Sequence, residues 1–195
     1  GIVHLGIGAF HRAHMAVYVD DLLGKDPSWG IVGASLRRPD TKEALEPQDG
    51  LYTIAVRDAK GTHPRVIGSI LSVMDANAQR EDLLALMADP SIRIVSLTVT
   101  EKGYCHDPAT GELDQKHADI VHDLSNPTAP KSAPGMLVEA LARRKAGGVA
   151  PFTVMSCDNL PSNGETAKRI VTAFAALRDA DLRARLLPDN RMEGA

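Results

Sequence analysis

The sequence has few cysteines, no long apolar run and no excess of positive charge, and each shortage excludes a class of protein. Two cysteines among 195 residues, Cys105 and Cys157, cannot build a disulfide framework, which favours a reducing compartment. No apolar stretch approaches the roughly 20 residues that a transmembrane helix needs. The net charge of -3 gives no electrostatic reason to expect a nucleic-acid partner. The first residues do not resemble a secretory signal, so we expect a cytoplasmic globular protein.

Strand-like and helix-like segments alternate along the chain. Apolar and β-branched runs predict strands at 2–5, 29–36, 92–99 and 152–156. Helical periodicity predicts helices at 13–23, 80–87, 118–124, 136–145 and from 163 onward. This alternation is typical of a Rossmann-type, doubly wound α/β fold with a mostly parallel sheet and helices on both faces. A chain of this length can bury the core of one such domain.

Two local patterns add detail to this fold. Leu51–Val56 and Arg65–Leu71 alternate in polarity around the turn-like segment Asp58–Gly61, which predicts an inserted β-hairpin. Asp40–Glu43 and Ser162–Glu165 have the spacing of a capping box, which predicts that a helix begins at each. Prolines make the segment from 126 to 134 an irregular surface loop in this interpretation.

The first strand runs into a glycine pair, Gly6 and Gly8, and a helical pattern follows at once. This layout lets backbone N–H groups and a helix N-terminus hold a pyrophosphate, although a plain tight turn would look the same. The third glycine of the usual fingerprint is missing, because His11 stands in its place. Arg12 near a helix start opposes the helix dipole, which a bound anion would relieve; a solvated arginine is the alternative.

Polar loops follow three apolar runs, at Gly6–Arg12, Thr98–Tyr104 and Ser156–Pro161. In a parallel sheet such loops meet beyond the carboxyl ends of the strands, where ligands bind. The same residue types also favour ordinary caps and turns, but three coinciding loops favour a site. His11 and His14 have a spacing that could bind a metal ion, yet no third ligand accompanies them, so we predict no metal site.

The cofactor cannot be chosen from the residues alone. Arg37 and Arg38 directly follow the second strand and suit the 2′-phosphate of NADP, whereas an acidic residue there would bind the ribose of NAD. Asp40 comes slightly later, and the basic pair could equally form a solvated turn. Cys105 and Cys157 lie neither at a predicted helix N-terminus nor beside a predicted base, so we expect inert thiols.

Five blocks of sequence together resemble a known family, the polyol-specific long-chain dehydrogenases, which include mannitol 2-dehydrogenase and fructuronate reductase (mannonate oxidoreductase). The blocks run in order through essentially the whole chain and are specific as a set. They are IVHLGIGAFHRAH near the start, DGLYT at 49–53, IVSLTVTEKGYC at 94–105, NPTAPKSAPG at 126–135 and FTVMSCDNLPSNG at 152–164. The fourth block is somewhat closer to the fructuronate reductases.

The resemblance implies an NAD-binding Rossmann-type domain followed by a mostly helical substrate domain, with reversible hydride transfer between NAD(H) and a polyol or sugar acid. NAD is the usual cofactor of this family, which outweighs the NADP interpretation of Arg37. Carried over by motif, the cofactor-binding residues are Gly6, Gly8, Phe10, His11, Arg12, Arg37, Thr98 and Thr100. Glu101 matches a glutamate of the proton path, and Asn159 matches an asparagine that polarises the substrate oxygen.

One family motif is missing. The general base of the family is a lysine in a Lys-x-x-x-x-Asn-x-x-His motif of the helical domain, and no lysine here has that spacing. The segment Pro188–Met192 lies about where the family continues into its next strand. We therefore expect residues 1–195 to be the cofactor half of a two-domain enzyme, inactive alone and prone to weak self-association. A non-catalytic nucleotide-binding module and an S-adenosylmethionine-dependent methyltransferase are the alternatives.

Overall fold

Six parallel strands form the central sheet of the computed structural model, which describes residues 1–182 and the backbone of 192–194. The strands are β1 (Ile2–Leu5), β2 (Ile31–Ser35), β5 (Ile70–Asp75), β6 (Ile94–Leu97), β7 (Thr153–Ser156) and β8 (Met192–Gly194). Their order across the sheet is β5-β2-β1-β6-β7-β8, and every neighbouring pair is parallel. This is the strand order of a dinucleotide-binding doubly wound sheet, so the predicted fold class is confirmed.

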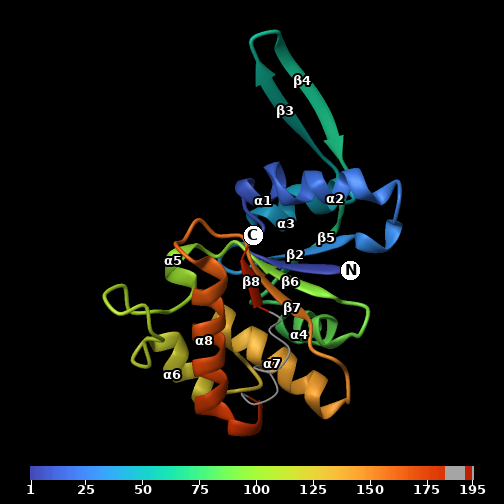
Figure 1. Cartoon of the computed structure of the whole chain (residues 1–195). Helices are drawn as coiled ribbons and strands as arrows, with labels where there is room; N and C mark the ends of the chain where they lie inside the picture. Colours follow the sequence, from blue (N-terminus) through green and yellow to red (C-terminus); the bar gives the residue numbers. More distant parts are fainter. Residues whose placement is uncertain (183–191, 195) are drawn as a thin grey trace.

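The helices cover both faces of this sheet. They are α1 (Ala9–Ala13), α2 (Met15–Leu23), α3 (Asp40–Leu45), α4 (Arg80–Ala88), α5 (Thr100–Gly103), α6 (Ala118–Ser125), α7 (Ala133–Ala146) and α8 (Asn163–Arg178), with 3₁₀ turns at Pro27–Trp29 and Glu46–Gln48. Figure 1 shows α1, α2 and α3 on one side and α4, α6, α7 and α8 on the other. Successive residues of β1 alternate accordingly: Ile2 joins the apolar cluster of α2, and Val3 joins that of α4 and α7.

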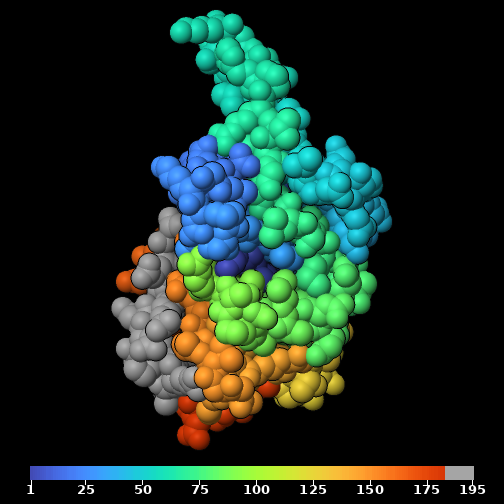
Figure 2. All heavy atoms as spheres, turned by 90° about the vertical axis from the view of Figure 1, so that its right-hand side faces the viewer, coloured from blue at the N-terminus to red at the C-terminus, as the bar shows by residue number. Residues whose placement is uncertain are grey.

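The predicted hairpin is present as β3 (Tyr52–Asp58) and β4 (Gly61–Ile67), which pair antiparallel. Figures 1 and 2 show it projecting far from the body of the molecule. Most of its side chains are exposed, because only its root, the part near the body of the domain, reaches the core, through the buried Ile67 and the half-buried Tyr52 and Ile54.

The prediction of one continuous strand over Arg65–Leu71 is wrong. This segment contains the end of the hairpin strand β4 and the start of the edge strand β5. Gly68 and Ser69 separate the two. The backbone N–H of Gly68 donates to Asp20 Oδ1 at 2.8 Å, and the Ser69 hydroxyl donates to the carbonyl oxygen of Ala16 at 2.6 Å. Both acceptors lie on α2, so this helix turns the chain from the hairpin into the sheet.

The helix starts differ from the sequence-based prediction, either in position or in how they are capped. The helix expected at Ala13–Leu23 is present as α2, and a short helix that was not predicted, α1, precedes it; the two meet at His14. Helices do begin at Asp40–Glu43 and Ser162–Glu165, but neither start has a side-chain cap, so both predicted capping boxes are wrong. Ser162 has φ +47°, whereas the residue that caps a helix start usually has an extended backbone.

Among the described residues, no helix is both long enough and apolar enough to cross a bilayer. The family resemblance places the next strand at about the segment Pro188–Met192, of which residues 188–191 lie outside the described residues. The strand β8, which begins at Met192, pairs in parallel with β7 at one edge of the sheet.

Candidate cofactor and active site

The turn after β1 requires glycine at two positions for different reasons. Gly6 has φ +95°, and a Cβ on it would lie 2.2 Å from the carbonyl oxygen of Thr98, so the fold itself excludes a side chain. Gly8 is extended, and a Cβ there would have no neighbour nearer than the Gly6 oxygen at 3.8 Å. A side chain at Gly8 would therefore enter the cavities that this turn lines.

A first cavity of about 520 Å³ opens at the carboxyl ends of β1, β2 and β6. Among the described residues it is lined by four cationic side chains and one carboxylate, those of Arg37, Arg38, Lys102, Lys131 and Asp119. The whole chain has a net charge of -3, so positive charge is concentrated here. Such a cavity favours an anionic ligand.

A second cavity of about 410 Å³ adjoins the first, and both are lined by Gly6, Gly8, Thr98 and Thr100. Its remaining described lining includes two acids and no lysine or arginine; the residues are Ala9, Phe10, Glu101, Cys157, Asp158, Asn159 and Leu160. The Phe10 ring is 56% exposed and stacks on His14 at 4.3 Å between ring centroids. This cavity combines an aromatic wall with amide and carboxylate groups.

Asp158 joins two of the three polar loops. Its carboxylate accepts hydrogen bonds from the backbone N–H of Val99 at 3.1 Å and of Thr100 at 2.9 Å, and from the Tyr104 hydroxyl at 2.8 Å. Thr100 has φ +66°, a conformation that a β-branched residue rarely adopts, and the bond from its N–H to Asp158 stabilises it. Burial raises the pKa of Tyr104, which keeps its hydroxyl protonated as the donor.

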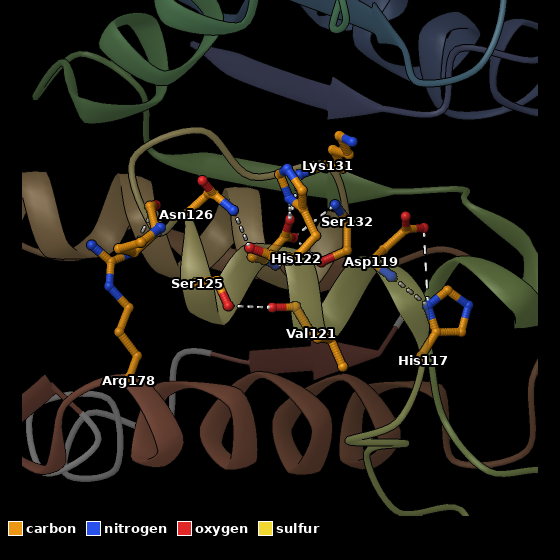
Figure 3. A network of polar contacts seen from close by, with 12 residues as sticks. His117, Asp119, Val121, His122, Ser125, Asn126, Lys131, Ser132 and Arg178 are labelled. Atoms are coloured by element: carbon orange, nitrogen blue, oxygen red, sulfur yellow. Dashed lines mark hydrogen bonds and ion pairs between the residues drawn. The ribbon is translucent and has the colours of Figure 1, made fainter.

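Asp123 holds the N-terminus of α7 against the first cavity. Its fully buried carboxylate accepts from the N–H groups of Lys131 and Ser132 at 2.8 and 2.9 Å, from the Ser132 hydroxyl at 2.7 Å and from His122 Nδ1 at 2.9 Å. Ser132 in turn caps α7 by accepting from the N–H of Gly135. Figure 3 shows Lys131 and Ser132 side by side, with the lysine directed away from α6. The helix therefore begins three residues earlier than predicted.

Arg12 lies in the last turn of α1, where a cation agrees with the helix dipole. The dipole argument for an anion contact is therefore wrong. Its guanidinium donates to the carbonyl oxygen of Ile7 at 3.0 Å and to Thr41 Oγ1 at 3.4 Å, and its carbonyl oxygen accepts from the Tyr52 hydroxyl. Arg12 lines neither cavity. Through its hydrogen bond to Ile7 it supports the turn Gly6–Gly8, which is called the glycine turn below.

His11 also lies behind the turn. It is 1% exposed, stacks on His4 at 3.5 Å between ring centroids, and neither of its ring nitrogens has a hydrogen-bond partner. Burial, together with the charge of Arg12, lowers the pKa of His11 to about 4. The missing third glycine is thus replaced by a buried neutral imidazole that packs against β1.

Cys105, His117 and Asp119 place their possible ligand atoms within 4.8 Å of one another at the wall of the first cavity. His117 Nδ1 accepts from the N–H of Asp119 and so caps α6, as Figure 3 shows. Burial, with nearby carboxylates, raises the pKa of Cys105 to about 12, and burial raises that of Cys157 to about 11. Both thiols are poor nucleophiles, in line with the expectation of inert cysteines. The absence of a metal stays a prediction.

The structure brings eight of the ten predicted site residues to the two adjoining cavities. They are Gly6, Gly8, Phe10, Arg37, Thr98, Thr100, Glu101 and Asn159. Their predicted roles stay predictions, as do those of His11 and Arg12. Sequence reasoning singled out neither Asp158, a half-buried residue of the third polar loop, nor the fully buried Asp123. Asp123 could have been found, because an acid on the apolar side of a predicted helix indicates a group that binds backbone N–H.

Comparison with known proteins agrees with this geometry. The family model described as "Mannitol dehydrogenase Rossmann domain" matches residues 1–186. Mannitol 2-dehydrogenase of Cereibacter sphaeroides is 48% identical over 93% of this chain, and D-mannonate oxidoreductase of Escherichia coli is 49% identical over 94%. The chain spans 39% of the length of each of these relatives.

Two solved structures share the fold. A mannitol 2-dehydrogenase of Pseudomonas fluorescens, in a ternary complex with NAD and D-mannitol, has a TM-score of 0.90 and 45% identity. A substrate-free D-sorbitol dehydrogenase has a TM-score of 0.91 and 41% identity. Each likeness covers 94% of this chain and at most 39% of the solved one. The chain belongs to the mannitol dehydrogenase family, of which it carries the Rossmann domain.

Proposed function

We propose that this chain is the cofactor-binding part of an NAD-dependent oxidoreductase that transfers a hydride between NAD(H) and a polyol or sugar acid. The observation that carries the proposal is the position of Gly8. This residue lines the cavities at the end of β1, where the strand order reverses because β2 and β6 lie on opposite sides of β1. Dinucleotides bind at this switch point in sheets of this topology. The names of the relatives, mannitol 2-dehydrogenase and D-mannonate oxidoreductase, support the substrate class.

The two cavities suit different parts of the dinucleotide. We assign the diphosphate and adenosine to the first cavity, because its four cations suit phosphate oxygens. We assign the nicotinamide and the substrate to the second, which offers the Phe10 ring and the polar groups of Glu101 and Asn159. Lys131, held by Asp123, is a further cofactor contact in this proposal.

The nicotinamide supplies or accepts the hydride when it is bound. Around it, the Asn159 amide donates an N–H to the substrate oxygen and stabilises the negative charge that develops there. Glu101, whose side chain is 61% exposed and lies 3.7 Å from His106, passes a proton between the site and solvent. Asp158 fixes the loops that carry both residues.

We propose that catalysis also needs a second, mostly helical domain outside these 195 residues. Two observations support this: the relatives are longer, and the Lys-x-x-x-x-Asn-x-x-His motif of the family base does not occur here. Loss of a general base costs about 10²- to 10⁴-fold in rate. The chain alone is therefore expected to bind NADH and to turn over little.

NAD is the proposed cofactor rather than NADP. The solved relative named above carries NAD, and this supports the choice although Arg37 and Arg38 line the adenosine side. Arg38 lies 3.8 Å from the Asp40 carboxylate, and both side chains are exposed. The methyltransferase and the non-catalytic module receive no support from the comparisons.

We also propose a cytoplasmic location and weak self-association. The location is supported by the two free cysteines, Cys105 and Cys157. Self-association is supported by exposed apolar side chains near the root of the hairpin, those of Leu51, Val66 and Leu71. A monomeric sedimentation profile at high concentration would count against it.

The test of the proposed function is a titration of the chain with NADH followed by fluorescence. We expect saturable binding, and we expect Gly8→Val to abolish it, since the new side chain occupies the cavity. Gly24→Val is the matched control, because Gly24 has an ordinary helical φ and a Cβ there would meet no atom within 4 Å. Absence of saturable binding at millimolar NADH would overturn the proposal.

A further inference from the structure

β1 buries a histidine in the middle of an apolar strand. His4 is 0% exposed between Val3 and Leu5, and both of its ring nitrogens are used. Nδ1 lies 2.7 Å from Ser96 Oγ, and Nε2 lies 2.8 Å from Thr98 Oγ1. Burying a histidine in a sheet core costs free energy unless both ring nitrogens have hydrogen-bond partners, and here both have one.

The direction of each hydrogen bond follows from the atoms involved. The Thr98 hydroxyl lies 2.7 Å from the carbonyl oxygen of Gly6, and a carbonyl has no hydrogen, so Thr98 donates. A threonine hydroxyl has one hydrogen, and that hydrogen is now used. His4 must therefore donate from Nε2 to Thr98. Burial lowers the pKa of His4 well below its usual value, so the ring is neutral and Nδ1 accepts from Ser96.

This chain of donors ends at the glycine turn. The Gly6 oxygen accepts from Thr98 and also from the N–H of Gly8, at 2.6 Å. The one carbonyl thus fixes the orientation of the peptide that leads into Gly8, the residue that opens into both cavities. The ring of His11 stacks on one face of the His4 ring.

We propose that His4 is a positioning residue for the cofactor: its Nε2–H directs the Thr98 hydroxyl onto the Gly6 oxygen and so holds the glycine turn in the shape that receives the diphosphate. In this arrangement Thr98 has no hydrogen left for a ligand, and it acts through the turn. The inference rests on the proposed function, because it assigns a cofactor to this turn.

The first test needs no cofactor. Proton–nitrogen correlation spectra of the ¹⁵N-histidine-labelled chain report the tautomer of each ring, and we expect His4 to be neutral with hydrogen on Nε2. Hydrogen on Nδ1, or a charged ring at neutral pH, would overturn the proposal. Thr98→Val should release the fixed tautomer, and Thr98→Ser, which keeps the hydroxyl, should preserve it.

The second test is a double-mutant cycle on NADH affinity. We expect His4→Leu and Thr98→Val each to weaken binding about tenfold, the scale of one broken buried hydrogen bond. If both act through the same relay, the double variant is also weakened about tenfold rather than a hundredfold. His4→Gln, which can keep an N–H donor toward Thr98, should restore most of the affinity. Circular dichroism checks that each variant is folded.

The outcomes separate the two proposals. If the unaltered chain does not bind NADH, the proposed function fails, and the tautomer still decides whether the relay exists. If it binds and the two losses simply add, Thr98 contacts the cofactor independently and the inference fails. If His4→Leu does not fold, the comparison of Thr98→Val with Thr98→Ser decides: equal affinities overturn the inference.

Discussion

The two cavities share Gly6, Gly8, Thr98 and Thr100, yet they use charge in opposite ways. In the first, four cations line the wall. In the second, the acids dominate, and one of them, Asp158, is already bound by two backbone N–H groups and a tyrosine hydroxyl. The charges of the first cavity are thus available to a ligand, whereas the main carboxylate of the second maintains the wall.

The two adjoining cavities form one groove, and this difference gives the groove a polarity, with one end cationic and the other acidic. A dinucleotide has anionic phosphates at its centre and, when oxidised, a positive charge on the nicotinamide ring. If its phosphates lie against the cations and its nicotinamide ring lies in the acidic half, each charge of the dinucleotide faces protein groups of opposite charge. Electrostatics alone would therefore set the direction in which the cofactor lies, before any base or ring is recognised.

The largest effect should come from Asp158→Ala. The change leaves the N–H groups of Val99 and Thr100 and the Tyr104 hydroxyl without their acceptor. We expect a loss of about 4 kcal/mol in the free energy of unfolding, or a melting temperature lower by about 10 °C. Thermal denaturation followed by circular dichroism measures it.

The matched control is Glu43→Ala, which removes an exposed acid on α3. It should change the melting temperature by no more than about 2 °C. If Asp158→Ala were equally mild, the carboxylate would not maintain the wall, and the contrast between the two cavities would fail.

Acid should weaken the support that both cavities share. The pKa of His11 is about 4 when folded and near 6.5 when unfolded, so the unfolded chain binds more protons between these values. The contribution of His11 to the free energy of unfolding is fully present above about pH 6.5 and falls by about 3 kcal/mol as the pH drops to about 4. His4, whose pKa burial also lowers, adds to the loss in the same direction. Urea denaturation at a series of pH values measures this slope.

His11→Phe keeps an aromatic ring against His4 and removes the titration, so its stability should depend less on pH in this window. Thr62→Ser, on the exposed hairpin, changes no titratable group; it is the control and should keep the original slope. An unchanged slope in His11→Phe would show that the buried imidazole is not the cause.

The smallest effects should distinguish the two cavities by ligand charge. Arg37→Gln should weaken NAD⁺ and NADH alike, by about threefold at low salt, because the diphosphate is common to both. Glu101→Gln should weaken NAD⁺ by about twofold and leave NADH unchanged, since only the oxidised ring is positive. Fluorescence and calorimetric titrations at two salt concentrations measure both. Equal effects of Glu101→Gln on the two forms would contradict the proposed polarity.

Features that depend on local pattern could be predicted from the sequence. Apolar runs gave β1, β6 and β7, and the polar loops after them form the site, because parallel strands present their carboxyl ends at one edge. The glycine pair was found for the same reason: Gly6 needs its positive φ whatever ligand binds.

Features that depend on distant segments could not be predicted. His11 looked like a loop residue, but its place is set by stacking on β1, and Arg12 turned inward because Ile7 and Thr41 offer acceptors there. Asp158 bonds to residues nearly 60 positions earlier in the chain, so its neighbours exist only after folding. The same holds for β5, whose start is fixed by contacts of Gly68 and Ser69 with α2.

The projecting hairpin has a practical consequence. Its tip, Asp58–Gly61, is exposed, and no residue of β3 or β4 lines either cavity. Its root is the sensitive part, because Tyr52 bonds to the backbone of Arg12 behind the glycine turn. A fluorophore or an inserted peptide at the tip would therefore report on or display the domain while leaving the groove intact, whereas the same insertion at the root would not.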